Sequence, residues 1–363
     1  MTETANWNPT WVVSPGEVLT EALEERGMTQ AELGRRMARP LKTISEIATG
    51  KAAITPETAI QLERALGISV ATWLALESRY REARARERDS EELKSHVEWL
   101  RMFPIKELIE RGIIRRKGSE PQRAADLLSY LGVSSPAGWE QYWGQVAASY
   151  RMSEKLSASP HAVTVWIREA EREAADLELP SYSMDGLEAQ VPALRSLTTA
   201  NVTAAAIAQA RDLLMSVGVG LLLMKGIRGA PASGAVRWVR GNPWIVLTLR
   251  HRTDDQLWFS LFHEVGHLLE GGRRRDVIEA IPGEQDSESE DEHAADTFAR
   301  DVLLPEFAWN ERAHPGSPNR ATIKEVASEY GVAPGIVVGR LERDGLIPPG
   351  RFRDLKRRVG SSS

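Results

Sequence analysis

Residues 258–267 read Trp-Phe-Ser-Leu-Phe-His-Glu-Val-Gly-His and contain a His-Glu-x-x-His pattern that begins at His263. On a helix, His263 and His267 are one turn apart on the same face, so both imidazoles can reach one metal ion. Glu264 lies beside them, where its carboxylate can accept a proton from a water molecule that attacks a carbonyl carbon. The same pattern also occurs on ordinary helix surfaces, so its surroundings decide between the two interpretations.

The surroundings favour a helix that is preceded by a small sheet. Thr253 is a good N-cap for this helix, and Gly266 within it suggests that another backbone approaches closely. Three runs rich in β-forming residues come before the helix, at residues 218–227, 234–239 and 243–249. We expect the last of these strands to pair with an extended substrate.

A third metal ligand has to come from elsewhere in the chain, because a catalytic zinc usually takes three protein ligands and keeps one position for water. The chain has no cysteine, so His, Asp and Glu are the strong ligands that remain. A helix expected over residues 292–304 offers Glu292 in its first turn, and we predict that Glu292 is the ligand. Glu288 and Glu290 in the same acidic run are the alternatives, and the run also fits a solvated helix start.

Asp296 follows Glu292 by one helical turn. From there its carboxylate can accept an N–H from a coordinating histidine and so fix the tautomer of that ring. The predicted centre is therefore Zn²⁺ held by His263, His267 and Glu292, with Mn²⁺ as the alternative ion.

Residues 14–78 read as five short helices separated by turns. Ser14 and Pro15 are suited to start the first helix, and Thr29 is suited to cap the second. The third helix is expected over residues 41–48, and the fifth is expected to end near residue 78.

The remaining features of the sequence define the fold class and the organisation of the 363 residues. We expect a mainly α protein with a small β-sheet (α+β). The expected domains are 1–78, a helical connector and scaffold at 79–200, the metal domain at 201–310 and a helical extension at 311–363. The apolar runs are too short to cross a membrane, and the polar first residues do not resemble a signal peptide, so we expect a cytoplasmic protein.

The metal motif and its downstream helix resemble the ImmA/IrrE family of metallopeptidases. The resemblance rests on residues 258–267, on Glu292-His293-Ala294-Ala295-Asp296-Thr297-Phe298-Ala299 and on Leu303-Leu304-Pro305, and it covers roughly residues 200–345. It implies a zincin-like domain in which His263, His267 and Glu292 bind the metal and Glu264 is the catalytic base. It also implies a protein substrate, an Xre-type repressor. Ala294 departs from the family, which commonly has a second glutamate there.

The N-terminal segment is similar to HigA-like antitoxins of the Xre helix-turn-helix class, from Ser14-Pro15-Gly16-Glu17 to Ile54-Thr55-Pro56-Glu57-Thr58-Ala59. The similarity implies a recognition helix at residues 41–48. Lys42, Thr43 and Ser45 would face operator DNA, and Arg35, Arg36, Arg39 and Lys51 would lie near phosphates. Residues 1–77 carry seven Lys and Arg against ten Glu, so this module is net acidic and also fits protein binding or homodimer formation.

Two hypotheses follow from these patterns. In the first, the chain is a fused regulator that binds operator DNA or a repressor-like partner and hydrolyses a peptide bond in a regulatory protein. In the second, it is an antitoxin-like transcription factor whose zinc fold senses a signal or stabilises the structure without proteolysis. For a group that stabilises the transition state, the sequence offers His251, Arg252 and His314 as candidates, and these residues also fit an ordinary surface position.

Overall fold

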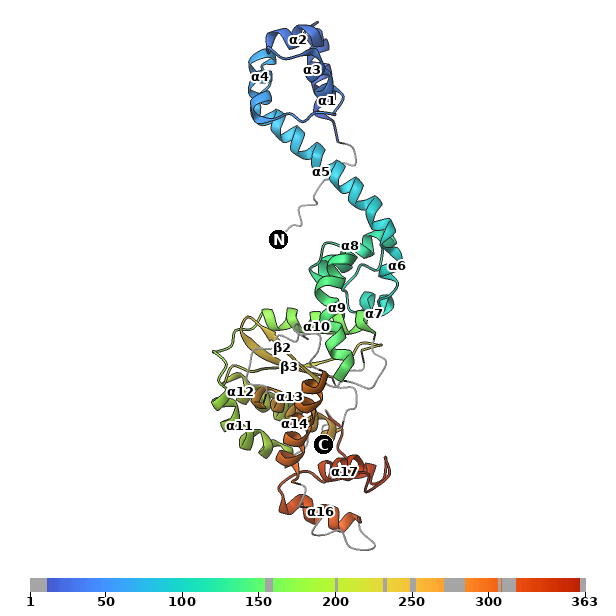
Figure 1. Cartoon of the computed structure of the whole chain (residues 1–363), viewed down its shortest axis with the longest axis vertical. Coiled ribbons are helices and arrows are strands. Elements are labelled where there is room, and N and C mark those ends of the chain that lie inside the picture. Colours follow the sequence, from blue (N-terminus) through green and yellow to red (C-terminus); the bar gives the residue numbers. More distant parts are fainter. Residues whose placement is uncertain are drawn as a thin grey trace. The chain divides into compact units, whose positions relative to one another are not determined.

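The computed structural model describes residues 12–153, 159–199, 202–230, 234–248, 253–270, 285–305, 308 and 318–359. These residues form helices and one three-stranded sheet (Figure 1), which confirms the expected α+β class. The chain divides into two compact units, one comprising Met1–Val97 with Ser119–Gln122 and the other Glu98–Gly118 with Arg123–Ser363. None of the described helices is long and apolar enough to cross a membrane.

The N-terminal unit contains the five helices that the sequence predicts. They are α1 (Pro15–Glu25), α2 (Gln30–Arg36), α3 (Leu41–Ala48), α4 (Pro56–Leu66) and α5 (Val70–Ser95). Four of them start at a Ser or Thr whose hydroxyl accepts a backbone N–H of the first turn, namely Ser14, Thr29, Thr55 and Ser69. Each helix contributes to one core, through Leu19, Leu33, Ile44, Leu62 and Trp73 respectively.

Helix α5 is longer than the sequence analysis predicts, because it does not end near residue 78. Neither glycine nor proline interrupts residues 79–95. Oppositely charged side chains pair one turn apart along the helix, as Arg81 does with Glu77 and Arg86 with Glu82. Each exposed pair of this kind contributes only about 0.3–0.5 kcal/mol. The charged run is therefore helical, as expected, but it continues the fifth helix without a break.

Five helices connect this unit to the sheet: α6 (Val97–Leu100), α7 (Ile105–Glu110), α8 (Glu120–Leu131), α9 (Pro136–Ser153) and α10 (Pro160–Ala175). The aromatic residues of this region pack on one another. The rings of Trp99, Phe103 and Trp139 meet edge to face, with centroids 4.8, 6.0 and 6.5 Å apart. The aromatic side chains of the tryptophan-rich stretch thus pack together into a small core.

The sheet follows α11 (Met184–Ser196), the 3₁₀ helix η1 (Leu197–Thr199) and α12 (Ala204–Met215). Its strands are β1 (Gly220–Met224), β2 (Gly234–Val239) and β3 (Asn242–Thr248), in the order β1-β3-β2. β3 is parallel to β1 and antiparallel to β2. In Figure 1, α10 lies on one side of the strands and α13 (Asp254–Glu270) on the other, and both contact the sheet.

The prediction that residues 243–249 pair with a substrate is wrong. β3 is the central strand, and its backbone N–H and C=O groups are bonded to β1 on one side and to β2 on the other. A strand paired on both sides has no free edge for a further strand. Among the described strands, the edges are β1 and β2.

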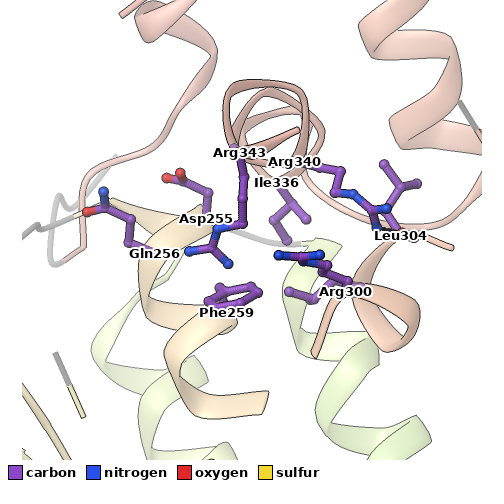
Figure 2. Close-up of a pocket in the computed structure, with 10 residues that line it drawn as sticks. Asp255, Gln256, Phe259, Arg300, Leu304, Ile336, Arg340 and Arg343 are labelled. Atoms are coloured by element: carbon purple, nitrogen blue, oxygen red, sulfur yellow. Dashed lines mark hydrogen bonds between the residues drawn. The ribbon is translucent and has the colours of Figure 1, made fainter. Parts of the chain in front are cut away.

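One core holds the metal-motif helix, the helices after it and the sheet together. The later elements are α14 (Gln285–Leu303), α16 (Arg320–Glu329), α17 (Pro334–Arg343) and the 3₁₀ helix η2 (Arg353–Leu355). The buried side chains of α14, α16 and α17 pack with those of α11, α12, α13 and the sheet, as Ile245, Phe262, Ala299 and Val337 illustrate, and Leu355 of η2 packs against them while partly exposed. Helices α13, α14 and α17 meet around the pocket drawn in Figure 2.

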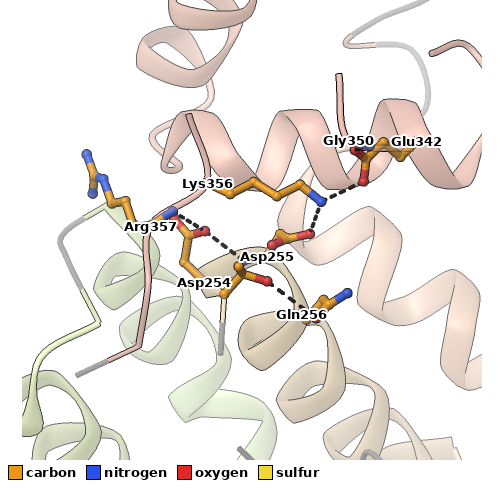
Figure 3. Close-up of polar contacts among 8 residues, drawn as sticks. Asp254, Asp255, Gln256, Glu342, Gly350, Lys356 and Arg357 are labelled. Carbon is orange, nitrogen blue, oxygen red and sulfur yellow. Dashed lines mark hydrogen bonds and ion pairs between the residues drawn. The ribbon is translucent and has the colours of Figure 1, made fainter. Parts of the chain in front are cut away.

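The C-terminal segment is attached to the start of α13 by buried charges (Figure 3). Lys356 Nζ donates to Asp255 Oδ2 at 2.7 Å and to Glu342 Oε2 at 2.6 Å. The backbone of Arg357 also exchanges two hydrogen bonds with Asp254, through its N–H and its carbonyl. Burial alone lowers the pKa of Lys356, but its two carboxylate partners outweigh that effect and raise the pKa. Lys356 therefore stays charged and bridges α13, α17 and the chain end.

We expect Lys356→Met to lower the free energy of unfolding of the second unit by about 3 kcal/mol, because it leaves the buried Asp255 carboxylate without a cation. The side chains of Lys356 and Asp255 are only 9% and 7% exposed, so water cannot replace the lost partner. Urea unfolding of the full chain measures the change. Arg351→Met removes an exposed cation and serves as the control, with an expected change below about 0.5 kcal/mol. Equal unfolding midpoints for the two variants would contradict the proposed role of the buried pair.

Candidate metal centre

Helices α13 and α14 pack unusually close to each other at Gly266. A methyl group at this position would lie 3.0 Å from Cα of Ala295 and 3.2 Å from a ring carbon of Phe298. A larger residue would therefore push the helices apart, which accounts for the glycine inside a helix. Helix α14 begins at Gln285 rather than at Glu292, so Glu292 lies within the helix and not in its first turn.

The close approach brings His263, His267 and Glu292 together. The two Nε2 atoms are 3.1 Å apart, and each lies 3.4 Å from one oxygen of the Glu292 carboxylate. With one ligand atom taken from each residue, all three atoms lie within 4.8 Å of one another. Ligand atoms about 2.0–2.1 Å from a tetrahedral Zn²⁺ are roughly 3.3 Å from each other. The nitrogen and carboxylate donors therefore fit a zinc ion in both chemistry and spacing.

Asp296 lies behind this group, where the sequence predicts it. Its Oδ1 is 3.0 Å from Nδ1 of His263. If the ring donates its Nδ1–H to this carboxylate, the lone pair of Nε2 points toward Glu292 and His267. This contact has the geometry expected of a carboxylate that fixes the tautomer of a metal-binding histidine.

The charges of the centre favour a bound cation. Burial lowers the pKa of His263, but the hydrogen bonds to Asp296 and Glu292 outweigh it and raise the pKa to about 10. For Glu292, burial raises the pKa, but the hydrogen bonds from the two imidazoles have the larger effect. The net pKa is lowered to about 2. The hydrogen bond with His263 likewise lowers the pKa of Asp296. Two ionised carboxylates therefore face the imidazoles, and their negative potential is available to a metal ion as well as to protons.

Glu264 occupies a buried position between α13 and the sheet. The residue is 7% exposed. A Cβ at Gly234 of β2 would lie 2.5 Å from Glu264 Oε1, so the strand makes room for the carboxylate by having no side chain there. Gly234 is a site residue that the sequence analysis missed, because only the sheet pairing places it beside the His-Glu-x-x-His helix.

His251, Arg252 and His314 lie outside the described residues, as do the side chains of Glu288 and Glu290. Two cations near the centre were missed as well. Arg300 is one turn beyond Asp296, a spacing that could have pointed to it, whereas Arg343 comes from α17 and carries no local signal.

The predicted DNA-binding residues lie on α2, α3 and the turns that flank α3. Five are exposed and two are half-buried; the exposed ones are Arg35, Arg36, Arg39, Lys42 and Lys51, and the half-buried ones are Thr43 and Ser45. Ile44 and Ile47 point into the core, so the opposite face of α3 is free of core contacts. Three of the cations have partners within the unit: Arg36 binds Glu32 at 2.6 Å, Lys42 is 3.8 Å from Glu46, and Arg39 donates to Gln61.

Comparison with known proteins assigns both parts of the chain. Residues 19–73 match the family described as Helix-turn-helix, and residues 228–342 match the family described as IrrE N-terminal-like domain. Over 71 residues the chain is 39% identical to the uncharacterized HTH-type transcriptional regulator YddM of Escherichia coli (strain K12), covering 20% of this chain and 76% of that protein. A solved addiction module antidote protein of the HigA family from Coxiella burnetii is 27% identical, with a TM-score of 0.21, and covers 23% of this chain and 91% of that one.

The two family matches lie in the two regions that the sequence motifs single out. The chain belongs to the Xre-type helix-turn-helix family, and it carries an IrrE N-terminal-like domain of the M78 peptidases after its DNA-binding domain.

Proposed function

We propose that this chain is a zinc-dependent endopeptidase that cleaves a regulatory protein, such as an Xre-type repressor, and binds operator DNA through its N-terminal domain. The observation that carries the proposal is the convergence of His263, His267 and Glu292, with Nε2–Nε2 and Nε2–carboxylate distances of 3.1 and 3.4 Å. Mn²⁺ is the alternative ion for the same donors. The fusion of the two domains supports a protein substrate that acts on transcription.

The residues of the centre have separate roles in peptide hydrolysis. His263, His267 and Glu292 would hold the zinc ion, which would polarise the scissile carbonyl and lower the pKa of a water molecule toward about 7. Glu264 accepts the proton of the attacking water and passes it to the leaving amine. Asp296 keeps His263 in the metal-binding tautomer. The outer edge of β2, next to Glu264 through Gly234, is the strand edge that we propose for an extended substrate.

Removal of a ligand should abolish zinc binding. We expect His263→Ala, His267→Ala and Glu292→Ala to purify with little zinc, whereas the wild type binds one ion per chain. His293→Ala is the matched control, because His293 is exposed and next to Glu292 in sequence. Asp296→Ala should keep the three ligands but weaken zinc affinity by about 10- to 100-fold. Elemental mass spectrometry measures the zinc content of each variant, and competition with a chelator measures its zinc affinity. A full complement of zinc in Glu292→Ala would exclude that residue as a ligand.

The catalytic role of Glu264 predicts that Glu264→Gln retains zinc and cleaves at least about 100-fold more slowly. The assay measures cleavage of a degenerate peptide library and of a panel of Xre-type repressors by the zinc-loaded full chain. Glu325→Gln, at an exposed position of α16, is the control and should cleave normally. Wild-type cleavage by Glu264→Gln would refute the mechanism. No cleavage by any form, with zinc-dependent operator binding, would favour the regulator without proteolysis, for which the burial of Glu264 is the supporting observation.

DNA binding by the N-terminal domain predicts a phosphate contact at Arg35, which is exposed on α2. Sequences selected by the full chain from a random duplex pool provide the binding site. Arg35→Ala should weaken binding to all selected sequences similarly and reduce the slope of log K against log salt by about 1. Arg81→Ala removes an equal charge that is already paired with Glu77 on α5, and it should leave affinity unchanged. Failure to select any sequence would argue for protein binding or dimerisation by this net acidic domain.

A further inference from the structure

A small pocket lies one helical turn from the metal centre, between α13, α14 and α17 (Figure 2). Arginines from α14 and α17 contribute to its walls, with Phe259 of α13 below them. The cavity measures about 40 Å³. One water molecule needs about 10–15 Å³ of such space, so the pocket has room for a group the size of a carboxylate.

Two of the guanidinium groups have unused hydrogen-bond donors. The guanidinium of Arg343 lies 3.3 Å from the ring centroid of Phe259, and within the described part of the chain it makes no hydrogen bond or ion pair. Nε of Arg300 is buried and likewise has no partner there. Arg340, the third arginine, is occupied, because it donates to Asp344 and to the carbonyl of Leu304. An arginine presents five donors in a fixed fork, which suits an incoming carboxylate.

The electrostatic environment supports an anionic ligand. Burial lowers the pKa of Arg343, and the positive charge of Arg300 lowers it further, while the carboxylates of Asp296, Asp255 and Asp344 oppose them without restoring the usual value. Of these carboxylates, Asp255 lines the pocket, and it is already bound to Lys356 at 2.7 Å. Asp296 does not saturate Arg300, since their closest atoms are 3.5 Å apart and Asp296 also binds His263 at 3.0 Å. An added carboxylate would therefore relieve the repulsion between two guanidinium groups.

The pocket is close enough to the centre to contact a bound peptide. Phe259 and His263 are four residues apart on α13, and their ring centroids are 6.1 Å apart. An extended peptide advances about 3.3 Å per residue, so a side chain within two residues of the scissile bond spans this distance. Arg343 keeps an exposed surface, through which such a side chain can reach its guanidinium.

We propose that this pocket is a specificity site, in which Arg300 and Arg343 bind the carboxylate of an Asp or Glu side chain within two residues of the bond that is cleaved. The inference rests on the proposed peptidase function for its substrate, whereas the binding of a carboxylate rests on the pocket alone. The two parts are tested separately.

The first test needs no catalysis. It follows the Nε–H resonances of Arg300 and Arg343 in the ¹⁵N-labelled, zinc-loaded Glu264→Gln chain. N-acetyl-glutamate amide should move both signals and N-acetyl-glutamine amide should not, because only the former carries the charge. Arg351, which lies 5.0 Å from the ring of Phe352, is the internal control and should not respond. A response to inorganic phosphate but not to the glutamate probe would overturn the proposal in favour of a free small anion.

The second test measures specificity. The wild type, acting on a degenerate peptide library, should prefer Asp and Glu over Asn and Gln by about tenfold at one position within two residues of the cleaved bond, as expected for a charge-assisted hydrogen bond. Arg343→Gln should remove this preference through KM, and Arg343→Lys should keep part of it. Arg351→Gln, at an exposed position outside the pocket, should keep all of it and should cleave neutral peptides normally. Zinc content confirms that each variant is folded.

The outcomes separate the two ideas. If peptides are cleaved without an acidic preference and the arginine resonances do not respond to the glutamate probe, the specificity-site proposal is refuted and the peptidase proposal is retained. If the arginine resonances respond to the glutamate probe but no peptide is cleaved, carboxylate binding by the pocket is supported and the proteolytic function is refuted.

Discussion

The close contact between Gly266 of α13 and Ala295 of α14 is the constraint on which the metal centre depends. The histidines come from one helix and Glu292 from the other, so the interhelical distance sets the 3.4 Å separations between nitrogen and carboxylate oxygen. A methyl group at Gly266 would already lie 3.0 Å from the opposing Cα. Even a small side chain there would shift one ligand set relative to the other, and metal ligands tolerate only a few tenths of an ångström.

Asp296 joins this centre to the arginine pocket. One of its oxygens is 3.0 Å from His263, and the other is 3.5 Å from Arg300 on the same helix. Any charge that enters beside Arg300 therefore acts on the carboxylate that orients a metal-binding ring. Arg300, proposed to select a substrate, and Asp296, proposed to fix the histidine tautomer, are neighbours. The free energies of carboxylate binding and of metal binding are therefore expected to be coupled.

Much of the centre could be predicted because its information is local. His263 and His267 share a face by spacing alone, and so do Glu292 and Asp296, which lie one turn apart on α14. What failed depended on partners far along the chain. The sequence does not say that β3 is central, because β1 and β2 flank it only after the sheet is assembled. The continuation of α5 past residue 78 was missed for a different reason: a charged run without Gly or Pro favours a helix but marks no end.

The groups proposed for catalysis and those proposed for substrate selection lie on different elements, and this follows from how the second unit is assembled. α13 and α14 supply the three proposed metal ligands, but Arg343 comes from α17, whose place over α13 depends on long-range contacts. Lys356 is central to these, because its ammonium group binds Asp255 on α13 and Glu342 on α17 together. Glu342 is adjacent to Arg343 in sequence, so the ion pair that anchors the chain end also positions the specificity arginine. Substitutions on α17 can therefore change substrate preference while the donors on α13 and α14 keep their geometry.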